Sequence, residues 1–240
     1  MPQAASALES LHMFAPFAAI AADRVAAVYA RLVATYGPHT LRPSCAPIDE
    51  LIQTILSQNT SDSNSGRAFR ALKALYPTWE EVIDAPVAEL YAVIRPAGLG
   101  NVKAPRIQAV LRDILQRRGA LNLDLLAELP LDAAKRWLTS LRGIGPKTAA
   151  CVLLFALGRP ALPVDTHVHR VAQRLGLIGP GVTAEQAHEL LEQALPAAQI
   201  YAFHVDMIQH GRRICHARRP ECGRCPLRDL CDFYRAAHDV

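Results

Sequence analysis

The sequence predicts an all-α protein, and three observations lead to this expectation. Apolar residues recur at intervals of three and four along most of the chain, as they do on the buried face of a helix. Clusters of glycine and proline separate these segments, which is typical of turns. No alternating apolar and polar run extends beyond a few positions, so strands are not expected. The predicted architecture is a set of packed helices with short connections.

The periodic segments define the expected helices in order. They span residues 25–35, 48–56, 65–75, 85–94, 103–117, 131–138, 147–157, 166–175, 184–195 and 197–209. The turns expected between them are "YPTW", "RPAGLGN", "RGIGP", "GRPALP" and "IGPG".

Composition indicates an ordinary globular protein. The chain has 240 residues, of which 51% are hydrophobic and 20% charged, and its net charge of +4 is only a weak sign of a polyanionic partner. No run of 18 apolar residues exists, so no membrane span is expected. The apolar stretch at 11–22 lacks a basic segment before it, which favours an N-terminal extension (1–24) over a secretion signal. A cytoplasmic protein is expected, associated with the nucleoid if it is bacterial.

The stretch "LRGIGPKTAA" (141–150) has the properties of a phosphate-binding turn between two helices. Gly143 and Gly145 allow positive φ and a close approach to another molecule, while Ile144 can anchor the turn. Pro146 suits the first position of a helix, where free N–H groups and the helix dipole attract anions. An ordinary glycine-capped turn explains the same residues, so the turn alone leaves phosphate binding open.

Lys147 and Asp165 are candidate catalytic residues. The expected helix from Lys147 is about 16 Å long, and the connector after it can reach back about 23 Å, so Asp165 can return to the same end. The simplest role of Asp165 is to cap the next helix. A nucleophilic lysine must be neutral part of the time, and the positive field of a helix start favours that form. Asp165 could then accept a proton or stabilise a cationic sugar transition state.

Four cysteines occur in the last 26 residues, with the spacing C-x6-C-x2-C-x5-C. They are Cys215, Cys222, Cys225 and Cys231. Four thiolates at this spacing can hold a structural metal or an iron–sulfur cluster. Zinc sites of this kind commonly have two C-x2-C pairs and this sequence has one, so a cluster is favoured, with zinc and disulfides as alternatives.

Arginines surround the cysteine loop. Six arginines and one acid lie between positions 211 and 228, and Arg218 and Arg219 fall inside the first cysteine loop. Such a run is usually a solvated surface, but a loop tied to a metal would hold the arginines in place to contact phosphates.

Taken together, these motifs resemble the endonuclease III family of base-excision DNA glycosylases, the helix–hairpin–helix group with a C-terminal [4Fe-4S] cluster. The family's hairpin pattern corresponds to residues 141–149 and its "VDTH" segment to 164–167, and the spacing of all four cysteines matches. The resemblance covers about residues 25–233.

The resemblance implies two helical lobes around a DNA groove. A six-helix barrel would span 43–159, and a cluster domain would combine 25–42 with 160–240. Lys147 would attack C1′ of a flipped, damaged nucleotide, and the resulting Schiff base would allow β-elimination 3′ to the abasic site. The implied substrate is an oxidised pyrimidine in double-stranded DNA. The protein is expected to act as a monomer.

The resemblance also implies DNA-contact residues. "ILSQNTSD" (55–62) and "AGLGNVKA" (97–104) resemble loops that insert side chains into the base stack. The first leaves Gln58 and Asn59 as alternative residues to fill the flipped-base gap, and the second offers Leu99. The full set is Gln58, Asn59, Leu99, Arg142, Gly143, Ile144, Gly145, Thr148, His167, Arg218 and Arg219.

The hairpin and both inserting loops depart from the family pattern, and the first inserting loop reads "SQNTSD" where the best-known members have "SAQATD". Pro146 stands where many relatives have arginine, Arg142 where proline is common, and Gly100 where an aromatic residue often follows the leucine.

A second hypothesis is a module that binds damaged or distorted DNA with little or no base excision.

Overall fold

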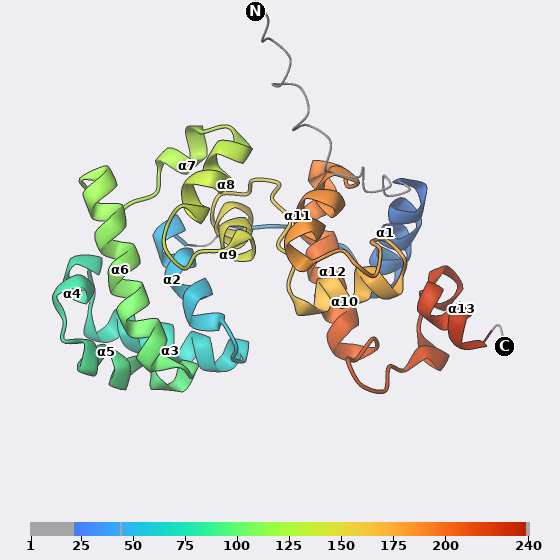
Figure 1. Ribbon diagram of the computed structural model, residues 1–240, viewed down its shortest axis with the longest axis horizontal. Coiled ribbons are helices and arrows are strands. Elements are labelled where there is room, and N and C mark those ends of the chain that lie inside the picture. Colours follow the sequence, from blue (N-terminus) through green and yellow to red (C-terminus); the bar gives the residue numbers. More distant parts are fainter. Residues whose placement is uncertain (1–21, 44, 239–240) are drawn as a thin grey trace, which may run out of the picture.

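A computed structural model describes residues 22–43 and 45–238 (Figure 1). All regular secondary structure in these residues is helical, which confirms the predicted fold class. The α-helices are α1 (Ala22–Tyr36), α2 (Pro47–Ser57), α3 (Asp62–Leu75), α4 (Trp79–Asp84), α5 (Val87–Ile94), α6 (Gly100–Arg118), α7 (Leu125–Glu128), α8 (Leu131–Thr139), α9 (Pro146–Cys151), α10 (Thr166–Arg174), α11 (Ala184–Gln193), α12 (Ile200–Arg213) and α13 (Asp232–His238). Shorter 3-10 or π-helical segments are η1 (Arg95–Ala97), η2 (Val152–Ala156), η3 (Ala197–Gln199), η4 (Cys222–Arg224) and η5 (Arg228–Leu230).

The predicted N-terminal extension lies almost wholly outside the described residues, and so does most of the apolar run at 11–22. None of the helices in the described part of the chain combines the length and the apolar character needed to cross a membrane.

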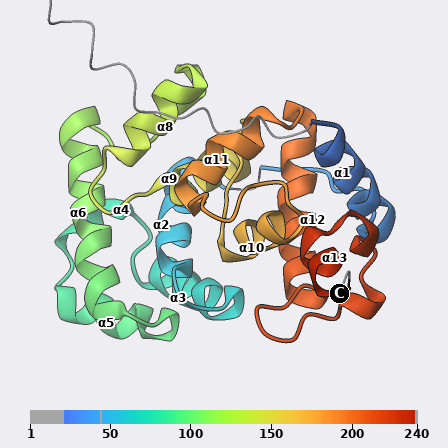
Figure 2. The same ribbon diagram turned by 45° about the vertical axis from the view of Figure 1, so that its right-hand side comes forward.

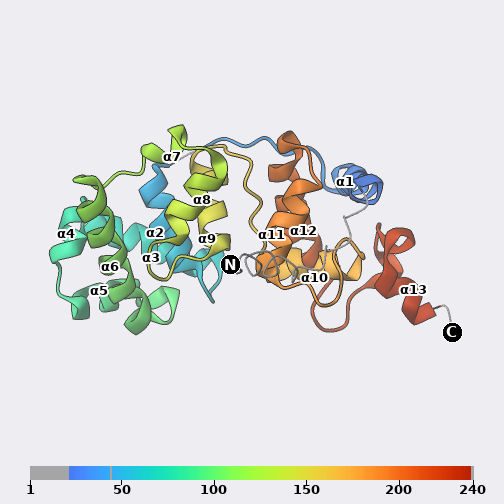
Figure 3. The same ribbon diagram turned by 45° about the horizontal axis from the view of Figure 1, so that its top comes forward.

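Two separate hydrophobic clusters divide the helices into two lobes, which lie side by side in Figures 1 and 3. Helices α2 to α9 enclose the first cluster, and α1 with α10 to α13 encloses the second. The chain passes between the lobes at 37–46 and again after η2. The domain boundaries predicted from the sequence remain a proposal, which this division of the core supports.

Helix α2 is central to the first lobe. Its side chains Leu51, Ile52, Ile55 and Leu56 are fully buried, and it packs against α3, α6, α9 and η2. Ser61 then caps α3 by accepting a hydrogen bond from the Asn64 backbone N–H. The short segment after α2 is therefore held between two helix ends.

Helix α4 lies where the sequence predicts a turn at 76–79 and no helix before 85. Thr78 and Glu81 form a reciprocal capping box, and the buried Trp79 ring donates from Nε1 to Asp49 at 2.9 Å. A helix of six residues is too short to show apolar periodicity, so only its capping sequence could have identified it.

Helix α12 is central to the second lobe, where it packs against α1 and α10. Helix α1, distant in sequence, is tied to the C-terminal segment (Figure 2). The Arg31 guanidinium donates to both carboxylate oxygens of Asp229 at 3.1 Å, and Arg24 pairs with Asp232. These contacts hold the cysteine-bearing loop against the lobe.

Candidate functional site

An open cleft lies between the two lobes. One wall comes from α2, α3, α9 and η2, and the other from α12 and the residue before α10. Lys147 lines the first wall and Asp165 the second, so the structure brings both predicted catalytic residues to one cleft. An ion pair of 2.8 Å between Arg212 and Asp62 links the walls.

Lys147 occupies the first turn of α9. Gly145 is the N-cap, and because it has no side chain it cannot form a capping hydrogen bond. Pro146 follows it, as expected for a helix start that leaves backbone N–H groups free. The Lys147 side chain is half-buried, and its positive charge acts on the Cys151 thiol one turn later, where it lowers the thiol pKa. Burial raises the pKa of Cys151 to about 11, so this neighbour stays an uncharged thiol near neutral pH.

Asp165 is the N-cap of α10, as predicted. Its Oδ1 accepts hydrogen bonds from the backbone N–H groups of His167 and Val168, both at 2.8 Å. The connector before it is fixed by His204, whose Nδ1 lies 2.8 Å from the Pro163 carbonyl oxygen. Burial lowers the pKa of His204 to about 4, so the ring is neutral and donates this bond.

The hairpin between α8 and α9 combines exposed and buried parts. Arg142, Gly143 and Gly145 are exposed, whereas Ile144 is buried in the first core, where it anchors the turn. Gly143 has a φ of +85°, and a Cβ there would lie 2.9 Å from Nε of Arg106. Both the backbone conformation and the space therefore require glycine at this position.

The loop after α2 separates the two residues that the sequence left as alternatives. Gln58 is half-buried and engaged: its Oε1 accepts from Arg106 at 3.0 Å, and its Nε2 lies 3.5 Å from Oγ1 of Thr148. Thr148 itself is buried, so its side chain does not reach the surface. Asn59 is exposed, with a left-handed backbone at φ +54°.

The loop before α6 presents an apolar side chain to solvent. Leu99 is 52% exposed and has a φ of +51°. Gly100 follows at the position where, in the family that the sequence resembles, an aromatic residue often stands. A Cβ at Gly100 would lie 2.9 Å from the Tyr91 ring of α5. Tyr91 thus occupies the space beside the loop, and its ring would have to shift to admit a larger residue at position 100.

Lys103 connects these two loops, and the sequence analysis assigned it no role. Its buried ammonium donates to the carbonyl oxygens of Leu56 at 2.7 Å, Gln58 at 2.6 Å and Ala97 at 2.9 Å. The signal was present in the sequence, because Lys103 falls on the apolar face of α6 at the helical spacing of Ile107. A lysine on the buried face of a helix must have hydrogen-bond partners inside the protein.

The four clustered cysteines line one cavity. None of the four is joined to another by a disulfide in the described residues. Within the described residues no group of three or more His, Cys, Asp or Glu side chains is arranged to hold a single metal ion. Four sulfurs around a cavity fit a multi-atom [4Fe-4S] cluster better than one zinc ion.

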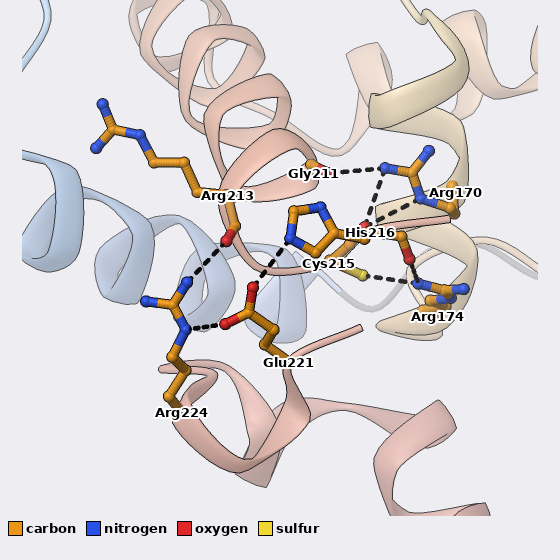
Figure 4. A network of polar contacts seen from close by, with 8 residues as sticks. All are labelled: Arg170, Arg174, Gly211, Arg213, Cys215, His216, Glu221 and Arg224. Carbon is orange, nitrogen blue, oxygen red and sulfur yellow. Dashed lines mark hydrogen bonds and ion pairs between the residues drawn. The ribbon is translucent and has the colours of Figure 1, made fainter. Parts of the chain in front are cut away.

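Basic side chains hold the first cysteine loop in place (Figure 4). Arg174 donates to Sγ of Cys215 at 3.2 Å and to the His216 carbonyl oxygen at 2.7 Å. Arg170 donates to the carbonyl oxygens of Gly211 and Cys215 at 2.9 and 3.0 Å. A metal-ligating sulfur with a hydrogen-bonded outer shell is expected of a cluster site.

The two arginines of this loop are directed to solvent, and His167 is not. Arg218 and Arg219 are exposed, and Arg219 has a φ of +53°. His167 is half-buried: its Nδ1 lies 3.1 Å from the Arg170 guanidinium, and the ring packs against Gly211 of α12. His167 therefore takes part in the contact between α10 and α12.

Comparisons with known proteins agree with this geometry. Residues 52–197 match the model of the HhH-GPD superfamily base excision DNA repair proteins, and residues 215–231 match the iron–sulfur binding domain of endonuclease III. The chain is 38% identical to endonuclease III of Thermotoga maritima over 79% of its length and 84% of that protein. It is 35% identical to endonuclease III of Escherichia coli K12 over 78% of its own length and 84% of that protein.

Solved structures resemble the whole described fold. A trapped endonuclease III–DNA covalent intermediate superposes with a TM-score of 0.77 at 30% identity, covering 90% of this chain and 98% of that one. A non-covalent endonuclease III–DNA complex has the same TM-score at 29% identity, and the match covers 91% of this chain and 99% of that one.

We predict that Lys103→Met destabilises the protein by ~3 kcal/mol, because three carbonyl groups lose a charged donor. Thermal unfolding would measure the loss, and hydrogen exchange should rise at 56–60 and 97–100. Lys73→Met is the matched control, since Lys73 donates to one carbonyl near the surface. Equal effects of both changes would contradict the role given to Lys103.

We predict that the purified protein is brown, absorbs near ~410 nm and contains iron. Cys222→Ser should lower the iron content because one thiolate ligand is lost, whereas Cys45→Ser should leave it unchanged. A colourless protein with stoichiometric zinc would contradict the cluster.

Proposed function

The chain belongs to the endonuclease III family of HhH-GPD base-excision DNA repair glycosylases, and on this premise we propose that it removes oxidised pyrimidines from duplex DNA and then nicks the strand with the same lysine. It carries the iron–sulfur binding domain of that family. The observation that supports the proposal best is the shared cleft of Lys147 and Asp165, each at the start of a helix. Two helix N-termini facing one cleft create a positive field where a DNA strand can bind.

In the proposed reaction, the Lys147 amine attacks C1′ of a nucleotide flipped into the cleft. The bond from C1′ to the base nitrogen breaks, and the base leaves with its electron pair. Asp165 accepts the proton released by the lysine nitrogen and stabilises positive charge on the sugar. Opening of the sugar ring then gives an imine between Lys147 and C1′. Loss of a C2′ proton breaks the C3′–O bond, which nicks the strand 3′ to the abasic site.

Flipping requires side chains that replace the base in the stack. Asn59 and Leu99 have the properties this role needs, since both are exposed and both have left-handed backbones that project them from their loops. Residues held in such conformations tend to occur at functional sites. Gln58 is bonded to Arg106 and near Thr148, so we propose that Asn59 fills the gap and that Gln58 supports the loop.

Phosphate contacts would come from both lobes. The exposed hairpin offers backbone N–H groups at the start of α9 together with Arg142, while the cysteine loop offers Arg218 and Arg219. Contacts of this kind hold DNA without reading its sequence. The cluster, when bound, would tie Cys215 and Cys222 together and so fix the arginine loop between them. Ile144, Thr148 and His167 act in this proposal through packing rather than side-chain contact.

We predict that borohydride traps wild-type protein covalently on a duplex with an abasic site or thymine glycol, and that Lys147→Ala forms no adduct, because Lys147 is the one lysine among the described residues that line the cleft. Lys135→Ala is the control, since this lysine of α8 is paired with Glu192 outside the cleft. Trapping of Lys147→Ala at the wild-type level would show that the nucleophile is another group. Binding of damaged duplex by wild type without base release would favour the DNA-binding module.

We predict that Asn59→Ala slows base release about tenfold or more, because the gap left by the flipped base is no longer filled. Gln58→Ala should chiefly lower thermal stability, through loss of its bond to Arg106. Single-turnover base release and thermal unfolding, measured on both variants, would separate the two roles. The reverse pattern would assign the gap to Gln58.

A further inference from the structure

One carboxyl group of the cleft has no role in the proposed reaction and no ion-pair partner among the described residues. Glu50 lies on α2, in the wall that also carries Lys147. Helix α2 packs directly against α9, so Glu50 is fixed relative to the lysine by the core of the first lobe. Among the described residues, no ion pair joins Lys147 to Glu50, to Asp165 or to any other acid. Glu50 and Asp165 are therefore not neutralised by a direct contact with the lysine, and the third carboxylate of the cleft, Asp62, pairs with Arg212.

Both oxygens of Glu50 are held by neighbouring side chains. The Thr54 hydroxyl, one turn later on α2, donates to Oε1 at 3.0 Å, and the Cys45 thiol donates to Oε2 at 3.6 Å. Thr54 is itself buried. The orientation of the carboxyl group is therefore set by the protein, which is the requirement for a group that recognises a ligand rather than one that moves in solvent.

The charges around Glu50 support an ordered acceptor. Burial and the adjacent Glu50 carboxylate raise the pKa of Cys45 to about 11, so the thiol keeps its proton and remains a donor. Burial raises the pKa of Glu50 above its ordinary value, and the hydrogen bonds from Thr54 and Cys45 and the positive charge of Lys147 only partly offset that rise. An ionised carboxylate accepts hydrogen bonds only, and each oxygen retains lone-pair capacity after these contacts.

We propose that Glu50 is a specificity-determining residue of the nucleotide pocket, whose carboxylate accepts a hydrogen bond from the ring N3–H of a flipped, oxidised or reduced uracil or thymine. This inference rests on the proposed glycosylase function. An imide N–H is a good donor to a carboxylate, whereas the N3 of a cytosine derivative carries a lone pair that a carboxylate repels. Gln53, three residues along α2, lines the same cleft and offers an amide donor for a ring carbonyl.

The test compares three substrates under single-turnover conditions with enzyme in excess. Duplexes would carry dihydrouracil, 5-hydroxycytosine or a preformed abasic site, which has the sugar but no base. The proteins would be wild type, Glu50→Gln and Glu50→Leu. Asp84→Asn serves as the control, because it removes an exposed carboxylate of the same lobe outside the cleft.

We expect Glu50→Leu to slow dihydrouracil release at least about tenfold, and abasic-site cleavage far less, because only the first substrate has a base to recognise. Glu50→Gln should raise the ratio of 5-hydroxycytosine to dihydrouracil release by about tenfold, since an amide can donate to the N3 lone pair. A purely structural role would not move this ratio. Asp84→Asn should behave as wild type.

Two results would overturn the inference. One is an equal slowing of all three substrates by the Glu50 variants, which would mean that Glu50 acts through Lys147 or the fold. The other is an unchanged substrate ratio in Glu50→Gln, a variant of nearly the same shape that keeps the test valid if Glu50→Leu fails to fold. Failure of the proposed function is distinguishable, because wild type would then give neither base release nor a borohydride-trapped complex at an abasic site.

Discussion

The loop after α2, which carries Asn59, and the loop before α6, which carries Leu99, depend on one buried ammonium group, that of Lys103. It binds the carbonyl oxygens of Leu56 and Gln58 at the end of α2, and of Ala97 at the end of η1. Burial and the nearby Arg106 guanidinium lower the pKa of Lys103, so the site is a costly place for a charge, and three charged hydrogen bonds offset that cost. In the described part of the chain no backbone hydrogen bond joins the two loops, so Lys103 provides a polar link between them.

A second contact joins the same loops to the hairpin. Arg106, one turn after Lys103 on α6, donates to Gln58 and packs over Gly143, whose missing side chain leaves room for the guanidinium. Helix α6 therefore supports the first loop with Lys103 and the hairpin with Arg106. Through these two residues, α6 sets the relative positions of Asn59, Leu99 and the start of α9, which are parts of the proposed DNA surface.

The sequence predicted the helices with strong periodicity and the residues carried by motifs, and it missed what depends on tertiary contact. Spacing alone placed Asp165 as a helix cap, and the chain geometry allowed it to reach the end of the helix that carries Lys147. It missed α4, which is too short for periodicity. The roles of Lys103 and Glu50 depend on which segments pack together, and no local pattern contains that information. The choice between Gln58 and Asn59 likewise needed side-chain partners that are distant in sequence.

Local conformation also separates the residues proposed for chemistry from those proposed for contact. Lys147 and Asp165 occupy ordinary helix starts, where glycine, proline and capping bonds fix the backbone. In the described part of the chain, the non-glycine residues with positive φ are Asn59, Leu99 and Arg219, which lie in three of the four loops that the sequence predicts to contact DNA; in the fourth, the hairpin, the positive φ belongs to Gly143. A left-handed backbone costs free energy in each of them, and the packed helices on either side must supply it. Strain is thus confined to exposed positions where a ligand would replace water, while the reactive groups are held by unstrained, hydrogen-bonded structure.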